Sequence, residues 1–231
     1  MKKIYHSIIL ARGGSKGIKN KNIQLLNGKP LLYYSVNVAK KFSKKNNIFV
    51  STDSNRISSL AKKLGVSVIK RPKLISKDNS PEIYAWKHAI QYLHRKKIFF
   101  DTFLSLPTTS PLRSFSDIKK SIKLLKKNID IVVTGSKSRR SPWYNMLKFN
   151  RKNGYAELLI KAKKKYKYRQ STPISFDMTT VCYVTRPSYI LKSGNLLRGK
   201  VKICEIPEER ALDIDSYYDL RLARLLTKDR K

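Results

Sequence analysis

A short loop near the start of the chain concentrates glycine and positive charge. The segment ARGGSKGIKNKN contains, in order, Arg12, Gly13, Gly14, Lys16 and Lys21. Glycine lets backbone N–H groups approach an anion because no Cβ stands in the way. Several basic side chains can then neutralise a triphosphate from different sides. The spacing matches neither the G-x-x-x-x-G-K-[ST] nor the G-x-G-x-x-G phosphate-binding pattern, so the loop by itself indicates only an anion site.

Two carboxylates stand close together near the end of the chain. Asp213 and Asp215 are two residues apart in LDIDSYYDL, and in an extended segment such residues face the same side. Paired carboxylates beside a phosphate site suit Mg²⁺, which binds one or two carboxylates together with phosphate oxygens and water. The alternative is a helix cap, because an aspartate also complements the positive end of the helix that follows. Asp215 is able to do both.

A third polar stretch is LPTTSPLRS, which follows a predicted strand. Its hydroxyl groups and the Arg113 guanidinium are suited to hold a base or a ribose. Taken alone, the stretch is only a turn.

Strand-like and helix-like segments alternate over the first 136 residues. The short apolar runs predict strands at 5–11, 47–53, 66–71, 102–107 and 130–136, and the amphipathic runs predict helices at 30–42, 54–65, 80–93 and 116–127. Two more strands are predicted at 179–186 and 200–207, and a final helix with Tyr218, Leu222, Leu225 and Leu226 on its apolar stripe. This rhythm predicts an α/β fold, with a mostly parallel sheet and helices on both faces. In such sheets ligands bind in the loops at the carboxyl ends of the strands, which is where the glycine loop lies.

The rhythm breaks after Ser136. Two β-like runs are joined by NRKNG, in which Asn153-Gly154 is a strong hairpin signal. We therefore expect one domain over 1–231 with a small β-rich insertion at about 138–176. The basic run at 161–169 could bind an anion, but a solvated edge strand blunted by lysine is the favoured interpretation.

The composition is strongly basic. The chain has 231 residues, of which 51 are Lys or Arg and 15 are Asp or Glu, giving a net charge of +36. Such a charge suits an anionic partner, including nucleic acid. However, 36 lysines against 15 arginines, scattered from end to end, favour a generally lysine-rich surface over a dedicated nucleic-acid face. We expect no specific nucleic-acid partner, and a basic nucleic-acid-binding protein remains the alternative from another functional class.

Other functional classes find little support. No apolar run is long enough to span a membrane, and the N-terminus lacks the pattern of a signal peptide, so a cytoplasmic location without a membrane partner is expected. Cys182 and Cys204 lie in strand-like runs, which favours buried reduced thiols. The three histidines, His6, His88 and His94, show no metal-ligand spacing.

Taken together, these stretches resemble the CMP-sialic acid synthetases, or acylneuraminate cytidylyltransferases. The resemblance rests on ILARGGSKGIKNKNI, GKPLLYYSV, VSTDS, RPKLIS, TTSPLR and LDIDSYYDL, in that order over nearly the whole chain. It implies a Rossmann-like fold and a homodimer in which the inserted lobe reaches across to the partner. It also implies Mg²⁺-dependent transfer of CMP from CTP to the anomeric hydroxyl of a 2-keto sugar acid, with pyrophosphate as the leaving group.

The resemblance also assigns roles to residues. The positions matching the family's CTP contacts are Arg12, Gly13, Gly14, Ser15, Lys16, Lys21 and Asn22. Asp213 and Asp215 match the metal ligands, and with Lys16 and Lys21 are expected to carry the catalysis. The sugar-side candidates are Thr109, Ser110, Arg169 and Gln170. Arg113 is a further substrate-binding candidate, for a base or a ribose.

The sugar half departs from the family pattern at three places. Pro107 replaces a glutamine that helps to bind the sugar, Asp177 stands where an arginine reads the sugar carboxylate, and Thr179-Thr180 replaces Asn-Gly. These departures favour an acceptor other than N-acetylneuraminate. A legionaminic- or pseudaminic-type nonulosonate and a shorter ulosonate fit equally well, and a nucleotidyltransferase for a sugar phosphate is a further alternative.

Overall fold

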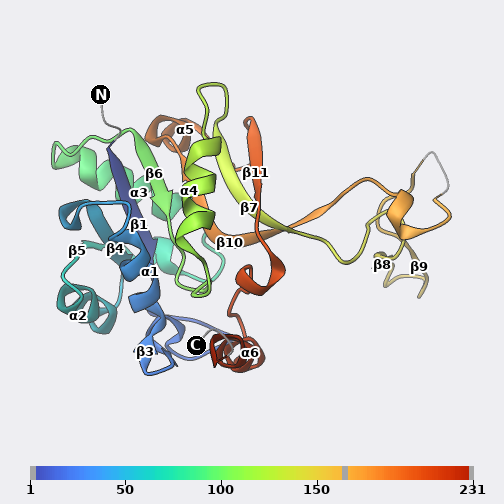
Figure 1. The fold of residues 1–231 in the computed structure, drawn as a ribbon, viewed down its shortest axis with the longest axis horizontal. Coiled ribbons are helices and arrows are strands. Elements are labelled where there is room, and N and C mark those ends of the chain that lie inside the picture. Colours follow the sequence, from blue (N-terminus) through green and yellow to red (C-terminus); the bar gives the residue numbers. More distant parts are fainter. Residues whose placement is uncertain (1–3, 163–165, 229–231) are drawn as a thin grey trace.

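One central sheet organises the chain in the computed structural model, which describes residues 4–162 and 166–228 (Figure 1). In these residues seven strands form the sheet, in the order β11-β7-β10-β6-β1-β4-β5. β10 is antiparallel to both of its neighbours, whereas the other pairings are parallel. The predicted mostly parallel sheet is therefore confirmed. The strands are β1 (Tyr5–Leu10), β4 (Ile48–Thr52), β5 (Ser67–Lys70), β6 (Thr102–Ser105), β7 (Ile131–Lys137), β10 (Phe176–Thr185) and β11 (Val201–Glu205).

Helices cover both faces of this sheet, as predicted (Figure 1). Ile9 and Val50 are buried in one cluster with residues of α1, α2 and α4, whereas Ile8 and Phe49 are buried in a second cluster with residues of α3 and α5. Neighbouring strand residues thus fill opposite layers, which explains why each strand carries three consecutive apolar residues, at 8–10 in β1 and 48–50 in β4. The helices are α1 (Leu31–Ala39), α2 (Asn55–Lys63), α3 (Glu82–Arg95), α4 (Phe115–Leu124), α5 (Pro187–Lys192) and α6 (Tyr217–Lys228).

Local signals set where these helices begin and end. Ser54 caps α2 by accepting a hydrogen bond from the Ile57 N–H, and Gly65 after the helix has a φ of +73°, which glycine adopts without steric cost. At α4, Ser114 and Asp117 form a reciprocal capping box. The shorter elements are η1 (Lys21–Ile23), η2 (Lys45–Asn47), η3 (Lys73–Ser76), η4 (Arg169–Ser171), η5 (Glu208–Arg210), β2 (Leu25–Leu26), β3 (Lys29–Pro30), β8 (Leu147–Phe149) and β9 (Ala156–Leu158).

The final helix is present, but its predicted apolar stripe is wrong in part. Leu220 and Ala223 are the residues of α6 that are buried, whereas Tyr218 is 73% exposed and Leu225 is also exposed. The helix packs on a small cluster that contains Ile18 and Leu26. Packing against residues far away in the sequence therefore determines which face of α6 is buried.

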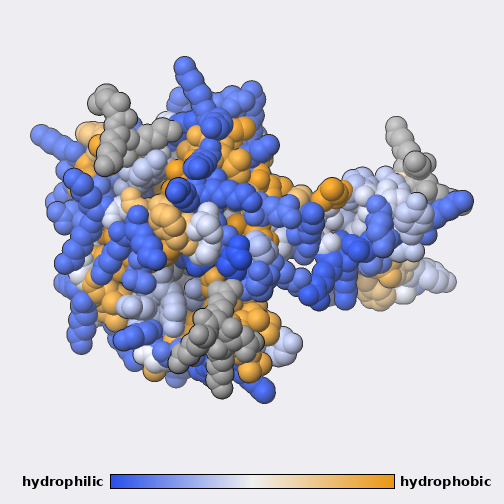
Figure 2. Space-filling view, viewed as in Figure 1, coloured by the Kyte–Doolittle hydropathy of each residue, from blue (hydrophilic) through white to orange (hydrophobic). Residues whose placement is uncertain are grey.

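A β-rich segment between β7 and β10 projects away from the sheet (Figure 1). The predicted hairpin is present: β8 and β9 pair antiparallel, and Gly154 in the turn has a φ of +73°. Residues 163–165, within the basic run at 161–169, lie outside the described residues. Hydrophilic residues cover much of the face seen in Figure 2, with apolar residues gathered where this segment leaves the body.

Two expectations from composition are tested by the fold. Cys182 and Cys204 are buried free thiols in the part of the chain that the structure describes, as predicted. Among the helices of that part, none is both long enough and apolar enough to cross a membrane.

One buried histidine is expected to make stability depend on pH. His6 stacks on Phe100 with 4.4 Å between ring centroids, and within the described residues neither ring nitrogen has a hydrogen-bond partner. Burial lowers the pKa of His6 from 6.5 to about 4. The unfolded chain therefore binds more protons than the folded chain between these values, so stability is complete above pH 6.5 and falls as the pH drops toward 4, by up to about 3 kcal/mol.

The check is urea unfolding at pH 7 and at pH 4.5. We expect His6→Phe to remove this part of the pH dependence, whereas His94→Gln, at a partly exposed position, keeps it. A wild-type slope in His6→Phe would contradict the assignment.

Candidate active site

A cavity of about 700 Å³ lies at the carboxyl ends of the parallel strands, the size range of small-molecule sites. Its walls are formed by the loop after β1, the segment between β5 and α3, the turn after β6, part of β10 and the segment after η5. The tertiary structure thus gathers polar stretches that are far apart in the sequence. The predicted site residues on the wall are Arg12, Ser15, Lys16, Lys21, Asn22, Thr109, Asp213 and Asp215.

The glycine loop and the carboxylate segment are held against each other. Ile18 and Ile214 are both fully buried in one apolar cluster. Because side chains alternate in an extended segment, burial of Ile214 turns Asp213 and Asp215 to the opposite side, where both line the cavity. Gly17 touches the same segment so closely that a Cβ there would lie 2.1 Å from the Asp215 carbonyl oxygen. Close backbone approach therefore requires glycine at this position.

The cations of the loop face carboxylates across the cavity. Arg12 Nη1 lies 2.5 Å from Asp78 Oδ1, and Lys16 Nζ lies 3.6 Å from Asp78 Oδ2. Lys21 Nζ lies 2.6 Å from Asp215 Oδ1. Exposed ion pairs of this kind contribute about 0–1 kcal/mol, whereas hydrogen bonds to charged groups contribute about 1.5–3 kcal/mol. A bound polyanion is therefore able to displace Asp78 from Arg12 and Lys16.

The two aspartates differ in their surroundings. The Asp215 side chain is 72% exposed, whereas Asp213 is mostly enclosed. Burial raises the pKa of Asp213, and the neighbouring Asp215 charge raises it further. Asp213 Oδ1 is buried without a hydrogen-bond partner among the described residues. A carboxylate oxygen in this state is suited to bind a cation.

These residues fit a hard divalent cation. No group of three or more histidine, cysteine, aspartate or glutamate residues with metal-binding geometry occurs in residues 4–162 and 166–228. A cation held by Asp213 and Asp215 would therefore complete its coordination shell with oxygen atoms of a bound substrate and with water. This is how Mg²⁺ is usually bound when its substrate carries phosphates.

Several wall residues, among them Arg71, Glu82 and Thr180, were not predicted as site residues from the sequence. Arg71 is buried, and its Nε and Nη2 atoms have no partner in the described chain. Glu82 is exposed as a residue at the start of α3, but its carboxyl group is enclosed, and burial raises its pKa to about 7. Thr180 reaches the wall from β10. Arg71 directly follows β5, so the rule that ligands bind at carboxyl ends of strands could have found it.

The expected contact of Arg113 with a base or ribose is wrong. Arg113 is buried, does not line the cavity, and donates hydrogen bonds to the Ser35 hydroxyl at 3.0 Å and to the Pro107 carbonyl. Burial lowers its pKa only to about 10, so the side chain stays charged. Its role is to hold the turn after β6 in place from behind.

Other predicted residues also hold the walls together. The Gly13 N–H, expected to face an anion, donates instead to Asp53 Oδ1 at 2.8 Å. Asn22 donates to the Arg12 carbonyl at 2.8 Å and accepts from the Thr108 hydroxyl, so it joins the first loop to the turn after β6. Gly14 is on the same loop without lining the cavity.

The structure does not bring every sugar-side candidate to the cavity. Ser110 is fully buried, and its hydroxyl contacts Thr180. Arg169 and Gln170 lie in η4 of the projecting segment and are exposed. Neither belongs to the cavity wall of its own chain.

Comparison with known proteins gives a consistent result. The family model described as Cytidylyltransferase matches residues 6–219. The chain is 32% identical to post-translational flagellin modification protein B of Campylobacter coli, over 96% of this chain and 94% of that protein. It is 31% identical to the CMP-N,N'-diacetyllegionaminic acid synthase of Campylobacter jejuni, over 94% of this chain and 92% of that protein. An N-acylneuraminate cytidylyltransferase of Streptococcus agalactiae is 28% identical over 92% of this chain and 50% of its own length.

Solved structures share the fold. A CMP:2-keto-3-deoxy-manno-octonic acid synthetase complexed with CTP superposes with a TM-score of 0.71 at 14% identity, covering 99% of this chain and 100% of that one. A 4-diphosphocytidyl-2C-methyl-D-erythritol synthase from Anaerococcus prevotii gives a TM-score of 0.62 at 14% identity, over 98% and 99% of the two chains. These likenesses confirm the Rossmann-like α/β fold.

Proposed function

We propose that this chain, which belongs to the cytidylyltransferase family, transfers CMP from CTP to the anomeric hydroxyl of a nonulosonate, a 2-keto sugar acid, with release of pyrophosphate. The observation that carries the proposal is one cavity in which a cationic glycine loop faces a buried carboxylate oxygen that has no partner in the described chain. The acceptor class is supported by whole-length similarity to a protein named CMP-N,N'-diacetyllegionaminic acid synthase.

The loop is suited to hold the triphosphate. Arg12, Lys16 and Lys21 reach the cavity from one side, so that they can neutralise phosphate oxygens and the negative charge that grows on departing pyrophosphate. Lys21 is the most enclosed of the three, with its side chain 15% exposed. Its position beside Asp215 places a cation next to the carboxylates, where the α-phosphate and the acceptor must meet.

Asp213 and Asp215 would hold the metal ion. Cytidylyltransferases of this kind generally use a divalent cation, and we propose Mg²⁺ from the all-oxygen donor set. When bound, Mg²⁺ would polarise the phosphate and lower the pKa of the attacking hydroxyl. The protein's own part is to orient the two carboxylates, exclude bulk water with the cavity walls and keep Lys21 beside them.

The sugar side supports an acceptor other than N-acetylneuraminate. Pro107 lines the cavity and, having no side-chain donor, cannot hydrogen-bond a sugar hydroxyl there. Asp177 is an exposed carboxylate whose Oδ1 accepts from the Ser138 hydroxyl at 2.8 Å, and a negative side chain would repel a sugar carboxylate placed beside it.

A pyrophosphate-release screen tests the function. CTP is combined with N,N'-diacetyllegionaminate, a pseudaminate, N-acetylneuraminate, 2-keto-3-deoxy-manno-octonate or a hexose phosphate, and UTP and ATP replace CTP as controls. We expect release with CTP and a nonulosonate other than N-acetylneuraminate. Release only with the hexose phosphate would refute the acceptor class. Steeply salt-dependent oligonucleotide binding, without any stabilisation by CTP, would refute the enzyme assignment.

Loss of a loop cation should weaken CTP use more than folding. Arg12→Ala and Lys16→Ala each remove a charge-assisted phosphate contact of about 1.5–3 kcal/mol, so kcat/KM for CTP should fall by about 10- to 150-fold. Both side chains are partly exposed, and melting temperatures should change little. Lys123→Ala, at an exposed position of α4 outside the cavity wall, is the matched control. Near-wild-type kinetics in both loop variants would remove the phosphate role.

We also propose that two chains pair through the projecting segment. Leu147, Phe149 and Tyr155 in and beside its hairpin are each at least 65% exposed, and a two-stranded hairpin by itself buries little apolar area. Pairing would cover these side chains. It would also allow Arg169 and Gln170 to serve a partner's cavity instead of their own.

Light scattering checks this pairing. The wild-type protein should measure as a dimer, and a chain lacking residues 143–160 should measure as a monomer. Because a deletion can disturb folding, Phe149→Asp serves as the milder variant, with Leu74→Asp, at an exposed position outside the segment, as its control. A dimer that survives both changes in the segment would refute the interface.

A further inference from the structure

A widened part of β10 brings an unassigned hydroxyl into the cavity. Thr179 pairs with Thr134 of β7, yet the next paired residue of β10, Tyr183, faces Val133. The three residues in between interrupt the regular pairing and are called the bulge here, because interruptions of this kind commonly re-aim a side chain beside a functional site. Thr180 is the first residue of this bulge, and its side chain lines the cavity.

The bulge is pinned by one buried threonine. Thr134 Oγ1 donates toward the carbonyls of Thr179 and Cys182, at 3.0 and 3.2 Å, and accepts from the Thr179 hydroxyl at 2.9 Å. Both ends of the bulge are therefore tied to the same side chain. The position of Thr180 is thus set by the sheet and not by a mobile loop.

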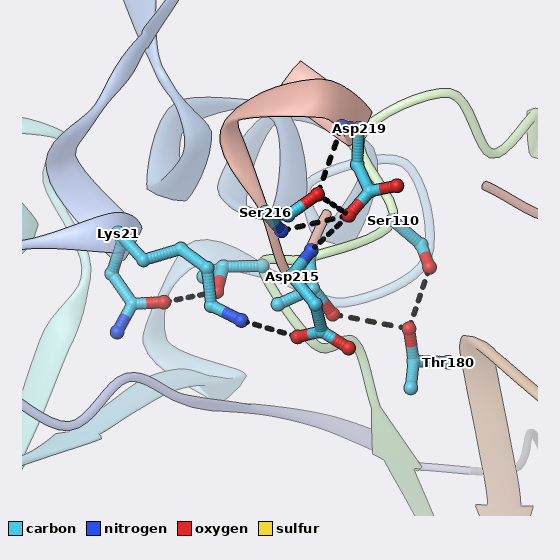
Figure 3. A network of polar contacts seen from close by, with 9 residues as sticks. Lys21, Ser110, Thr180, Asp215, Ser216 and Asp219 are labelled. Atoms are coloured by element: carbon cyan, nitrogen blue, oxygen red, sulfur yellow. Dashed lines mark hydrogen bonds and ion pairs between the residues drawn. The ribbon is translucent and has the colours of Figure 1, made fainter. Parts of the chain in front are cut away.

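Thr180 lies within a group of three hydroxyls next to the carboxylate segment (Figure 3). Its Oγ1 is 2.7 Å from Ser110 Oγ and 3.1 Å from Thr109 Oγ1. The hydroxyls of Thr109 and Thr180 also lie beside the Asp213 side chain and favour its ionised form. The backbone joins the same parts, because the Ile214 N–H donates to the Thr109 carbonyl at 2.8 Å.

The direction of these hydrogen bonds follows from the chemistry of the groups. An ionised carboxylate only accepts, so Thr180 can hold Asp213 only by donating its single proton to it. Its contact with Ser110 is then one in which Ser110 donates and Thr180 accepts. Ser110 is fully buried, so this donor has a fixed place. The inferred hydrogen bonds therefore run from Ser110 to Thr180 and from Thr180 to Asp213. Asp213 Oδ1 has no hydrogen-bond partner among the described residues.

We infer that Thr180 is a positioning residue: its hydroxyl holds the Asp213 carboxylate in one orientation, with one oxygen left for a cation. The inference deepens the proposed function and rests on the assignment of Asp213 as a metal ligand. Mutation of a residue that orients a metal ligand typically lowers metal affinity or activity by about 10- to 100-fold. We expect the Thr180 hydroxyl to have an effect of this size through Asp213, and not through the cationic loop.

The test compares three variants. Thr180→Val removes the hydroxyl and keeps the shape, and Thr180→Ser keeps the hydroxyl. Thr185→Val is the matched control, because Thr185 is a buried residue of the same strand whose hydroxyl donates to the Asp130 carbonyl at 2.7 Å, away from the cavity. Mn²⁺ binding in the presence of CTP is followed by the electron paramagnetic resonance signal of the free ion, and kcat and KM are measured in parallel.

We expect Thr180→Val to weaken Mn²⁺ binding and to lower kcat by about tenfold or more, with KM for CTP within about twofold of wild type. Thr180→Ser and Thr185→Val should both bind Mn²⁺ as wild type does. Wild-type Mn²⁺ affinity in Thr180→Val would overturn the inference, as would a Thr180→Ser variant impaired as strongly as Thr180→Val. If no acceptor is turned over, the proposed function fails, but Mn²⁺ binding still decides the role of Thr180. A wild-type protein that binds no Mn²⁺ with CTP would overturn that role.

Discussion

Asp213→Asn is expected to abolish most turnover, by about a hundredfold to a thousandfold, without unfolding the protein. The carboxamide keeps the shape of the side chain but is a poorer ligand for Mg²⁺. Stability should be unchanged or slightly higher, because burial and the neighbouring Asp215 charge already disfavour an ionised Asp213, as its raised pKa indicates. Pyrophosphate release and thermal melting measure the two effects separately.

Asp219 provides the matched control. Ser216 and Asp219 cap α6 reciprocally: Asp219 Oδ2 accepts from the Ser216 N–H at 2.7 Å, and the Asp219 N–H donates to the Ser216 hydroxyl at 3.3 Å. Asp219→Asn should therefore show the opposite pattern, with stability lowered by about 0.3–1 kcal/mol through loss of the negative charge at the helix N-terminus and activity largely kept. Equal loss of activity in Asp213→Asn and Asp219→Asn would contradict a metal role for Asp213.

The same capping box bears on Asp215. Its carboxylate pairs with Lys21, and its backbone N–H donates to Asp219 at 3.1 Å, so the cap expected as a rival role for Asp215 is supplied by its neighbours. Asp215→Asn should lose activity with nearly unchanged melting temperature, because the exposed ion pair with Lys21 contributes little to stability. Retained activity with unchanged Mg²⁺ dependence would leave Asp215 outside the site.

Gly17→Ala is expected to damage both stability and activity. A Cβ on Gly17 would lie 2.1 Å from the Asp215 carbonyl oxygen and 3.3 Å from its carbonyl carbon. Both are backbone atoms, so either the glycine loop or the carboxylate segment must move. Overpacking of this kind costs about 1–3 kcal/mol, and the movement would separate Lys21 from Asp215 and displace both from the cavity wall.

Gly14→Ala is the control on the same loop. A Cβ at Gly14 would meet no atom of the described chain within 4 Å, and an alanine there is expected to leave the melting temperature unchanged or slightly raised. The pair is compared by thermal melting and by kcat/KM for CTP. A Gly17→Ala protein that melts and reacts like the wild type would show that the two segments do not need their close contact.

The sequence by itself determined the parts of this protein that local patterns encode. The alternation of apolar strands with amphipathic helices indicated the α/β sheet, and Asn153-Gly154 indicated the hairpin between β8 and β9. Periodicity and turn chemistry act over a few residues, so they can be read without knowing the fold. The glycine loop and the Asp213 and Asp215 pair were found in the same way.

Only the tertiary structure decided which polar residues face the cavity. Arg113 and Thr180 are both polar and near predicted strands, yet Arg113 is buried behind the turn after β6 and Thr180 reaches the wall through a bulge in β10. Gly17 does not have a positive φ. Glycine is required at this position because the Asp215 backbone, far away in the sequence, lies directly against it. Whether a polar side chain faces the cavity depends on how segments distant in the sequence pack together and on which buried polar groups they hydrogen-bond. Patterns over a few neighbouring residues carry no information about such contacts.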